Sequence, residues 1–134
     1  MVKYFPFKVL LLYRPSEFQG AVLDGRDVGT VLCPNAEVKL FLIASAEVRA
    51  RRRLAELVSR NMVEAGNIEA QEKTYQQVLS DLKERDLRDS TRSTAPLKPA
   101  DDAHVIDTST MSAREVLDAA ARIIQGTCPW LLRA

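Results

Sequence analysis

The residues with the clearest chemical potential lie in one decapeptide, KERDLRDSTR, at positions 83–92. Arg85, Asp89 and Arg92 are spaced i, i+4 and i+7, so on one continuous helix they would share a side. Two guanidinium groups beside a carboxylate can bind a phosphate and a neighbouring polar group together. Ion pairs on a solvated helix face explain the same spacing, and from this peptide alone they are the commoner explanation.

The helix that must position this set is indicated by the apolar residues that precede it. They recur at i, i+3, i+4 and i+7, which predicts a buried stripe: Tyr75, Val78, Leu79 and Leu82. At roughly 100° per residue, the Arg–Asp–Arg set borders this stripe instead of lying opposite it. We therefore expect these charges to line a cleft.

A second candidate is the peptide GRDVGT at positions 25–30, which directly follows a predicted strand, Ala21–Leu23. In a parallel α/β sheet, ligands are held by the loops after the carboxyl ends of strands. Its two glycines would free the backbone for a tight turn and leave Arg26 and Asp27 pointing into the cleft. An ordinary polar turn beginning at Asp24 explains the peptide equally well.

A third candidate is a cluster of arginines, Arg49, Arg52 and Arg53, on a helix that Ser45 can cap. The apolar stripe of this helix is supplied by Ala50, Leu54, Leu57 and Val58. The arginines lie roughly 130° away from the stripe and are expected to point outward. Like charges at this spacing repel each other unless an anion such as a triphosphate joins them. From spacing alone, a solvated basic face with glutamates nearby is the commoner alternative.

Strands alternating with helices predict an α/β layer fold on a parallel sheet. Val38–Ile43 and His104–Asp107 read as strands, and a helix follows a capping box formed by Ser112 and Glu115. Val9–Tyr13 fits either a buried strand or a piece of helix. Residues 61–73 are predicted to be a weakly structured connection, and Gly126 is placed to end the last helix.

Composition limits the remaining functional classes. A chain of 134 residues with 46% hydrophobic and 28% charged residues is typical of a single globular domain. A net charge of +1 argues against general nucleic-acid binding. Cys33 and Cys128 are far apart, which suggests neither a zinc site nor a disulfide framework and fits the cytoplasm. His104 is the only histidine and lacks a ligand pattern, so no metal site is expected. No apolar run is long enough to span a bilayer.

Taken together, three motifs resemble the bacterial cytidylate kinase family. They are GAVLDGRDVGT at 20–30, VKLFLIASAEVRARRR at 38–53 and KERDLRDSTRSTAPLKPADDAHVIDTS at 83–109. Their order and spacing match across about residues 20–125. The resemblance implies a P-loop kinase-like three-layer α/β/α fold. It also implies transfer of the γ-phosphoryl group of ATP, with Mg²⁺, to CMP or dCMP.

The resemblance also implies roles for individual residues. Arg26 and Asp27 would lie around the nucleoside monophosphate. Arg85 and Arg92 would bind CMP through its phosphate and sugar, and Asp89 through the sugar hydroxyl. The lid, at about residues 45–90, would bring Arg49, Arg52 and Arg53 over the ATP phosphates and the transition state. A closing lid would also exclude water from ATP.

The sequence departs from the family pattern in its first twenty residues. Family members begin with a P-loop, G-x-x-x-x-G-K-[ST], and none of the five glycines here is followed by lysine. We therefore expect an amino-terminally truncated kinase core at 21–125, with unassigned segments at 1–20 and 126–134. Such a chain is expected to be inactive or weakly active, to self-associate, or to need a separate P-loop fragment. The alternative is a non-catalytic remnant with weak nucleotide binding or a partner-binding role.

Overall fold

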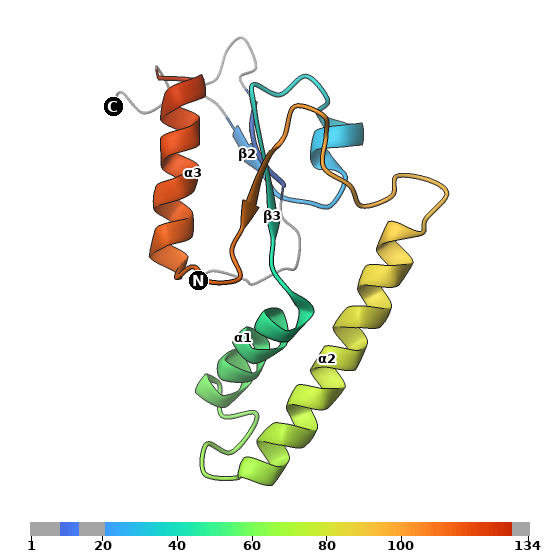
Figure 1. The fold of residues 1–134 in the computed structure, drawn as a ribbon, viewed down its shortest axis with the longest axis vertical. Helices are drawn as coiled ribbons and strands as arrows, with labels where there is room; N and C mark the ends of the chain where they lie inside the picture. Colours follow the sequence, from blue (N-terminus) through green and yellow to red (C-terminus); the bar gives the residue numbers. More distant parts are fainter. Residues whose placement is uncertain (1–8, 14–20, 130–134) are drawn as a thin grey trace. The chain divides into compact units, whose positions relative to one another are not determined.

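The computed structural model describes residues 9–13 and 21–129. They form two compact units, coloured along the sequence in Figure 1. The helical unit is Ala44–Thr91, and the sheet unit comprises the described residues 9–13, 21–43 and 92–129. The helical unit spans nearly the range assigned to the lid from the sequence; its action as a lid stays a prediction.

The sheet unit holds four strands in the order β2-β1-β3-β4: β1 (Val9–Tyr13), β2 (Ala21–Leu23), β3 (Val38–Ile43) and β4 (His104–Asp107). β3 and β4 pair in parallel, which fits the predicted α/β fold. β1 is a strand, which resolves the ambiguity of its sequence, and it pairs antiparallel with both β2 and β3. Only residues 14–20 separate β1 from β2, and a parallel pair would need a crossover of a dozen residues or more. The sheet is therefore mixed.

The core of the sheet unit lies on both faces of β3 because neighbouring side chains on a strand point to opposite sides. On one face, Val38 and Leu40 pack with Ile106 and Ala120. On the other, Phe41 packs with Val28 and Ala36. Val28 belongs to η1 (Val28–Leu32), a short π-helix that follows the GRD peptide.

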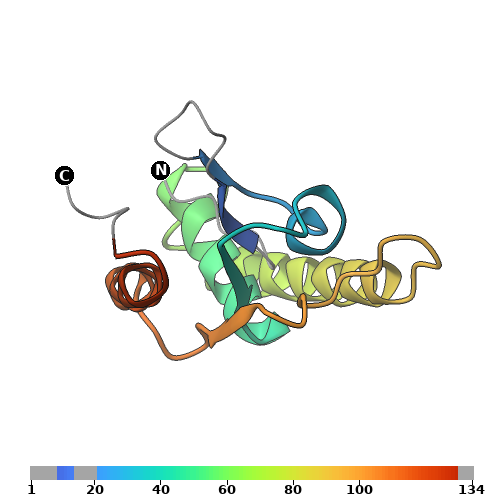
Figure 2. The same cartoon turned by 90° about the horizontal axis from the view of Figure 1, so that it is seen from above.

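α3 (Ala113–Thr127) lies along the sheet, as the two views in Figures 1 and 2 show. The predicted capping box is confirmed, because Ser112 and Glu115 each accept the other's backbone amide hydrogen. Of the expected apolar stripe, Ala120 is buried, whereas Leu117 is 65% exposed. The helix also continues one residue past Gly126, so the predicted end was one residue early.

The helical unit consists of α1 (Ala46–Ser59) and α2 (Ile68–Ser90), which lie side by side. Ser45 caps α1 as predicted, its Oγ accepting from the Val48 amide at 3.3 Å. The weak connection predicted at 61–73 is wrong beyond Asn67, because the side chain of Asn67 accepts from the Ala70 amide at 2.9 Å and starts α2.

α2 ends before the last charge of the decapeptide. The Thr91 amide and hydroxyl both bond to the Leu87 carbonyl, at 3.1 and 2.7 Å, and close the helix. The prediction that Arg92 shares one helix with Arg85 and Asp89 is therefore wrong, since Arg92 follows the helix and belongs to the sheet unit.

Parts of the unassigned segments 1–20 and 126–134 lie outside the described residues, which include only 9–13 and 126–129 of them. Within the described ranges, no helix is both long and apolar enough to cross a membrane.

Candidate functional site

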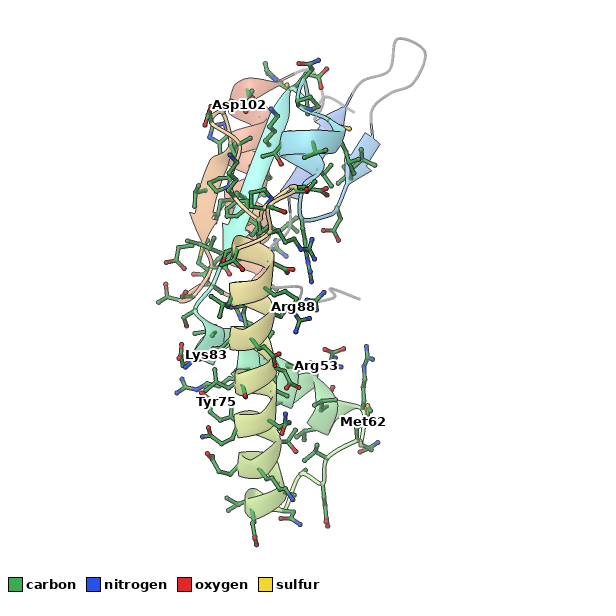
Figure 3. All side chains as sticks on the ribbon, turned by 90° about the vertical axis from the view of Figure 1, so that its right-hand side faces the viewer. Arg53, Met62, Tyr75, Lys83, Arg88 and Asp102 are labelled. Atoms are coloured by element: carbon green, nitrogen blue, oxygen red, sulfur yellow. The ribbon has the colours of Figure 1, made fainter. Side chains whose placement is uncertain are left out.

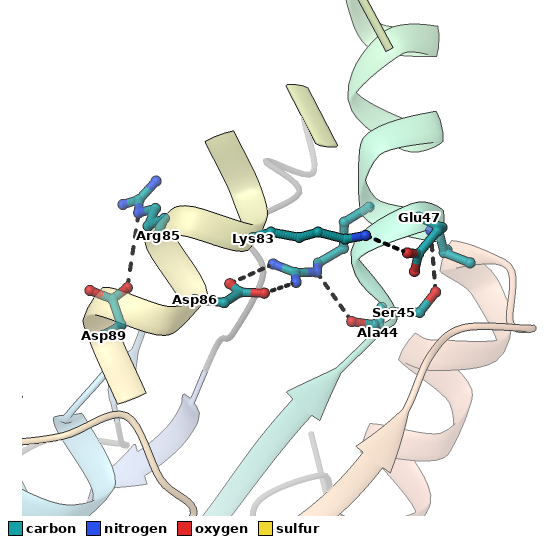
Figure 4. Close-up of polar contacts among 9 residues, drawn as sticks. Ala44, Ser45, Glu47, Lys83, Arg85, Asp86 and Asp89 are labelled. Atoms are coloured by element: carbon teal, nitrogen blue, oxygen red, sulfur yellow. Dashed lines mark hydrogen bonds and ion pairs between the residues drawn. The ribbon is translucent and has the colours of Figure 1, made fainter. Parts of the chain in front are cut away.

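The strongest local feature of the predicted site is the pair Arg85 and Asp89 on α2. The Arg85 Nε and an Asp89 carboxylate oxygen are 4.0 Å apart, one helical turn from each other (Figure 4). Asp89 is only 3% exposed, while the Arg85 side chain is 45% exposed. A buried carboxylate needs polar partners, because burial without them costs several kcal/mol, on the order of 2–7 for a polar group. The structure thus confirms that these two charges lie together.

The same peptide also bonds to α1, which the sequence analysis did not predict. The Lys83 ammonium lies 3.1 Å from a carboxylate oxygen of Glu47, and Asp86 pairs with Arg49. A hydrogen bond from the Glu47 backbone amide, followed by that from Lys83, lowers the pKa of the Glu47 carboxyl below its ordinary value. The spacing of Lys83 and Asp86, i and i+3, was the available sign of a second face.

Arg49 does not join an outward-facing cluster, and that expectation was wrong. It is 8% exposed, with its Nε donating to the Ala44 carbonyl at 3.1 Å and its Nη1 to Asp86 at 3.0 Å. Its Nη2 donates to the second oxygen of Asp86, which completes a bidentate pair. Helical projection alone cannot foresee this, because the carboxylate that makes the burial of the guanidinium tolerable comes from the other helix.

The other two arginines of the predicted cluster, Arg52 and Arg53, are more accessible. Arg52 is half-buried. Arg53, which is labelled in Figure 3, has a side chain that is 47% exposed. Arg53 lies 2.7 Å from Glu56, and Glu56 also pairs with Arg60 at 2.7 Å. These surface pairs are weak individually, so an anion could compete for Arg53.

Arg26 and Asp27 are half-buried in the sheet unit, where they lead directly into η1. The Asp27 carbonyl accepts from the amides of the first helical turn, at 2.8 Å from Val31. A Cβ on Gly25 would lie 2.4 Å from a methyl carbon of Val28, so only glycine permits this approach. The backbone bends at Arg26 and Asp27 and then enters η1.

The predicted residues are divided between the two units. Arg49, Arg52 and Arg53 on α1 and Arg85 and Asp89 on α2 belong to the helical unit, whereas Arg26, Asp27 and Arg92 belong to the sheet unit.

A buried lysine on β3 was missed entirely. Lys39 is 4% exposed; its Nζ donates to the Pro34 carbonyl and, at 2.8 Å, to Asp102. The hydrogen bond from Lys39 lowers the pKa of the Asp102 carboxyl. These contacts tie β3 to the segments that precede β3 and β4. In the sequence, a lysine inside an apolar strand was the sign that could have revealed it.

Two further features carry no predicted role. The first is the turn after β4, where a carboxylate oxygen of Asp107 accepts from the Ser109 amide at 2.9 Å, as in an ordinary polar turn. A cavity of about 300 Å³ opens between α1 and α2, and it is lined by Arg51, Leu54, Ile68, Gln71, Glu72 and Tyr75. None of these is a predicted site residue.

Comparison with known proteins accounts for the shared motifs. The chain is 51% identical to a protein named cytidylate kinase 1 from Haemophilus influenzae, over 106 residues that are 79% of this chain and 42% of that protein. It is 53% identical to the cytidylate kinase of Rhodospirillum rubrum over 110 residues, 82% of this chain and 47% of that one. The chain therefore spans a little under half the length of these relatives. The family model for cytidylate kinase matches residues 10–126, and the chain belongs to the cytidylate kinase family.

Proposed function

We propose that this chain serves in transfer of the γ-phosphoryl group of ATP, with Mg²⁺ as part of the donor substrate, to CMP or dCMP. The products are ADP and CDP or dCDP, and the reaction belongs in the cytoplasm. The observation that carries the proposal is the buried carboxylate of Asp89 beside Arg85, inside the motif that the chain shares with its family.

We assign the acceptor nucleotide to the charged residues of two motifs, GRD at 25–27 and KERDLRDSTR at 83–92. Arg85 and Arg92 would bind the phosphate and sugar of CMP, because a guanidinium matches phosphate oxygens bidentately. Asp89 would accept from a sugar hydroxyl, since an ionised carboxylate has only acceptors to offer. Arg26 and Asp27 would lie around the monophosphate.

The donor phosphates are assigned to the arginines of α1. Arg52 and Arg53 would neutralise the charge that develops during transfer, which is the main demand of phosphoryl-transfer catalysis. Arg49 was predicted to share this role, but its guanidinium is bonded to Asp86 and Ala44. We therefore assign the donor phosphates to Arg52 and Arg53.

We further propose that this 134-residue polypeptide alone turns over CMP weakly or not at all. Its sequence contains no G-x-x-x-x-G-K-[ST] motif, whose amides and lysine cradle the β- and γ-phosphates. The test is a coupled assay of ADP release with ATP, Mg²⁺ and CMP, for the chain alone and with a separate P-loop polypeptide. We expect little ADP release from the chain alone and more ADP release when the P-loop polypeptide is added. No turnover in either mixture would contradict a catalytic role for this polypeptide.

The second candidate is a non-catalytic chain that binds nucleotide weakly or binds a partner protein, and the lack of a P-loop motif favours it. Calorimetric titration with CMP separates the candidates from a chain with no nucleotide function. Binding without turnover in either mixture supports the second candidate, whereas turnover in the mixture supports the first.

A further inference from the structure

The peptide KERDLRD at 83–89 has two faces that pair differently. Lys83 and Asp86 bond to residues of α1, whereas Arg85 and Asp89 pair with each other (Figure 4). At 100° per residue, the two faces are roughly 110° apart around α2. One face thus fastens α2 to α1, and the other holds the pair assigned to CMP.

We infer that the Asp86–Arg49 pair fixes the position of α2 on α1 within the helical unit, and we call this pair the pin. Asp86 and Arg49 are then positioning residues for Arg85 and Asp89, and Arg49 is not a ligand of the ATP phosphates. The inference rests on the proposed function only for the role given to Arg85 and Asp89.

The bonding of Arg49 supports the first part. Its Nε, Nη1 and Nη2 all donate within the helical unit, to the Ala44 carbonyl and to both oxygens of Asp86. The side chain is 8% exposed, so a phosphate would have to displace Asp86 and open the contact between the helices. A bidentate arginine–carboxylate pair also fixes the relative orientation of its two partners. These properties suit a pin better than an anion site.

The neighbouring pair cannot carry this role alone. The side chains of Lys83 and Glu47 are 57% and 49% exposed, and exposed pairs contribute little to stability. Asp86 lies next to Arg85 and within one turn of Asp89, so a rotation of α2 would move both. Losing the Asp86–Arg49 pair should therefore disturb the acceptor pair of Arg85 and Asp89.

The pin is tested by NMR on the arginine Nε–H groups of the full chain. In Asp86→Asn we expect hydrogen exchange at the Arg49 Nε–H to accelerate at least about tenfold, because the buried pair is broken. Glu84→Gln is the matched control, since the Glu84 side chain is 72% exposed and pairs with Arg88 on the same helix. It should leave Arg49 unchanged. Equal exchange rates at the Arg49 Nε–H in the wild type and in Asp86→Asn would overturn the inference.

A milder variant, Arg49→Lys, keeps the positive charge but cannot form the bidentate pair with Asp86. It should lower the urea concentration at the midpoint of unfolding.

Ligand titrations test the positioning role separately. We expect CMP to bind about tenfold more weakly to Asp86→Asn than to the wild type or Glu84→Gln, because small displacements of binding groups are costly. The charge-exchanged double variant Arg49→Asp with Asp86→Arg should recover part of that loss. Tripolyphosphate should leave the Arg49 Nε–H resonance in place, and a saturable shift there would overturn the inference. A wild-type chain that does not bind CMP would contradict the proposed function, while the exchange measurement would still decide the pin.

Discussion

Asp89 is the buried carboxylate of the acceptor motif. Asp89 is 3% exposed, and the Arg85 Nε that pairs with it lies at 4.0 Å, at the limit of an ion pair. In the proposed function, this carboxylate accepts a hydrogen bond from a sugar hydroxyl of CMP. Arg92 follows three residues later, beyond the end of α2. The acceptor motif therefore combines two residues of α2, Arg85 and Asp89, with one residue outside the helix.

We predict that replacing the arginine aligned with Arg92 by alanine, in a full-length relative such as the Haemophilus influenzae protein, mainly damages the use of CMP. Losing a charge-assisted hydrogen bond costs about 2 kcal/mol, so KM for CMP should rise on the order of 10- to 100-fold. Steady-state kinetics with each nucleotide varied in turn measures this. KM for ATP serves as the internal control and should stay nearly unchanged; an equal loss for ATP would count against the assigned role.

A second residue-scale prediction concerns Lys39 and Asp102. Because Lys39 lowers the pKa of Asp102 in the folded chain, this carboxylate stabilises the fold above its ordinary pKa of 3.8. The contribution disappears as pH falls through the lowered pKa, where the native carboxylate is protonated. We expect the wild type to exceed Asp102→Asn in free energy of unfolding at neutral pH, with a difference that shrinks in acid. Urea unfolding across pH measures it, and Asp101→Asn, a change at the exposed neighbour, should leave the wild-type profile intact.

Single residues were predictable where one element decides their surroundings. Arg85 and Asp89 were placed together correctly because four residues on one helix fix their distance. Arg49 and Lys39 were misjudged or missed because their partners come from elsewhere, Asp86 from the second helix and Asp102 from 63 residues further along the chain. No local pattern contains that information.

At the scale of elements, the start of α3 gives a direct test of local sequence. Ser112 accepts from the Glu115 amide at 3.3 Å, and Glu115 accepts from the Ser112 amide at 2.7 Å. We predict that Ser112→Ala destabilises the chain by about 1 kcal/mol, the usual cost of a lost cap. Thermal unfolding measures the change. Ser80→Ala, at an exposed position in the middle of α2, is the control. An equal loss of stability in that variant would show that the lost cap is not the cause.

The starts of α1 and α3 and the strands β2, β3 and β4 could be predicted because caps and apolar runs are local signals. The direction of β1 could not, since its apolar run says nothing about which strand it pairs with. The early start of α2 was missed because residues 68–73 are mostly polar and show no apolar stripe, although the side chain of Asn67 caps them. For β1 the sequence lacks the strand pairing, and for α2 the start depends on a cap at Asn67 and not on the helix propensity of the residues that follow.

At the scale of the whole molecule, the two units divide the proposed chemistry. The helical unit carries the α1 arginines with Arg85 and Asp89, and the sheet unit carries Arg26, Asp27 and Arg92. Catalysis would require the residues of both units to meet on one pair of nucleotides.

The sheet unit leads to the last prediction, that the chain self-associates. Among the described strands, β2 lies at one edge of the sheet, and its Val22 and Leu23 are 57% and 38% exposed. An apolar edge strand with unpaired backbone groups is a template for pairing with another copy, and a charge on such a strand opposes pairing. We therefore expect sedimentation velocity to show concentration-dependent oligomers that Val22→Lys reduces. Met62→Lys, a change at a residue 67% exposed in the turn between α1 and α2, is the control and should leave the oligomers in place. A single monomeric species across the concentration range would contradict the prediction, and equal effects of both substitutions would show that net charge, not the edge of β2, governs association.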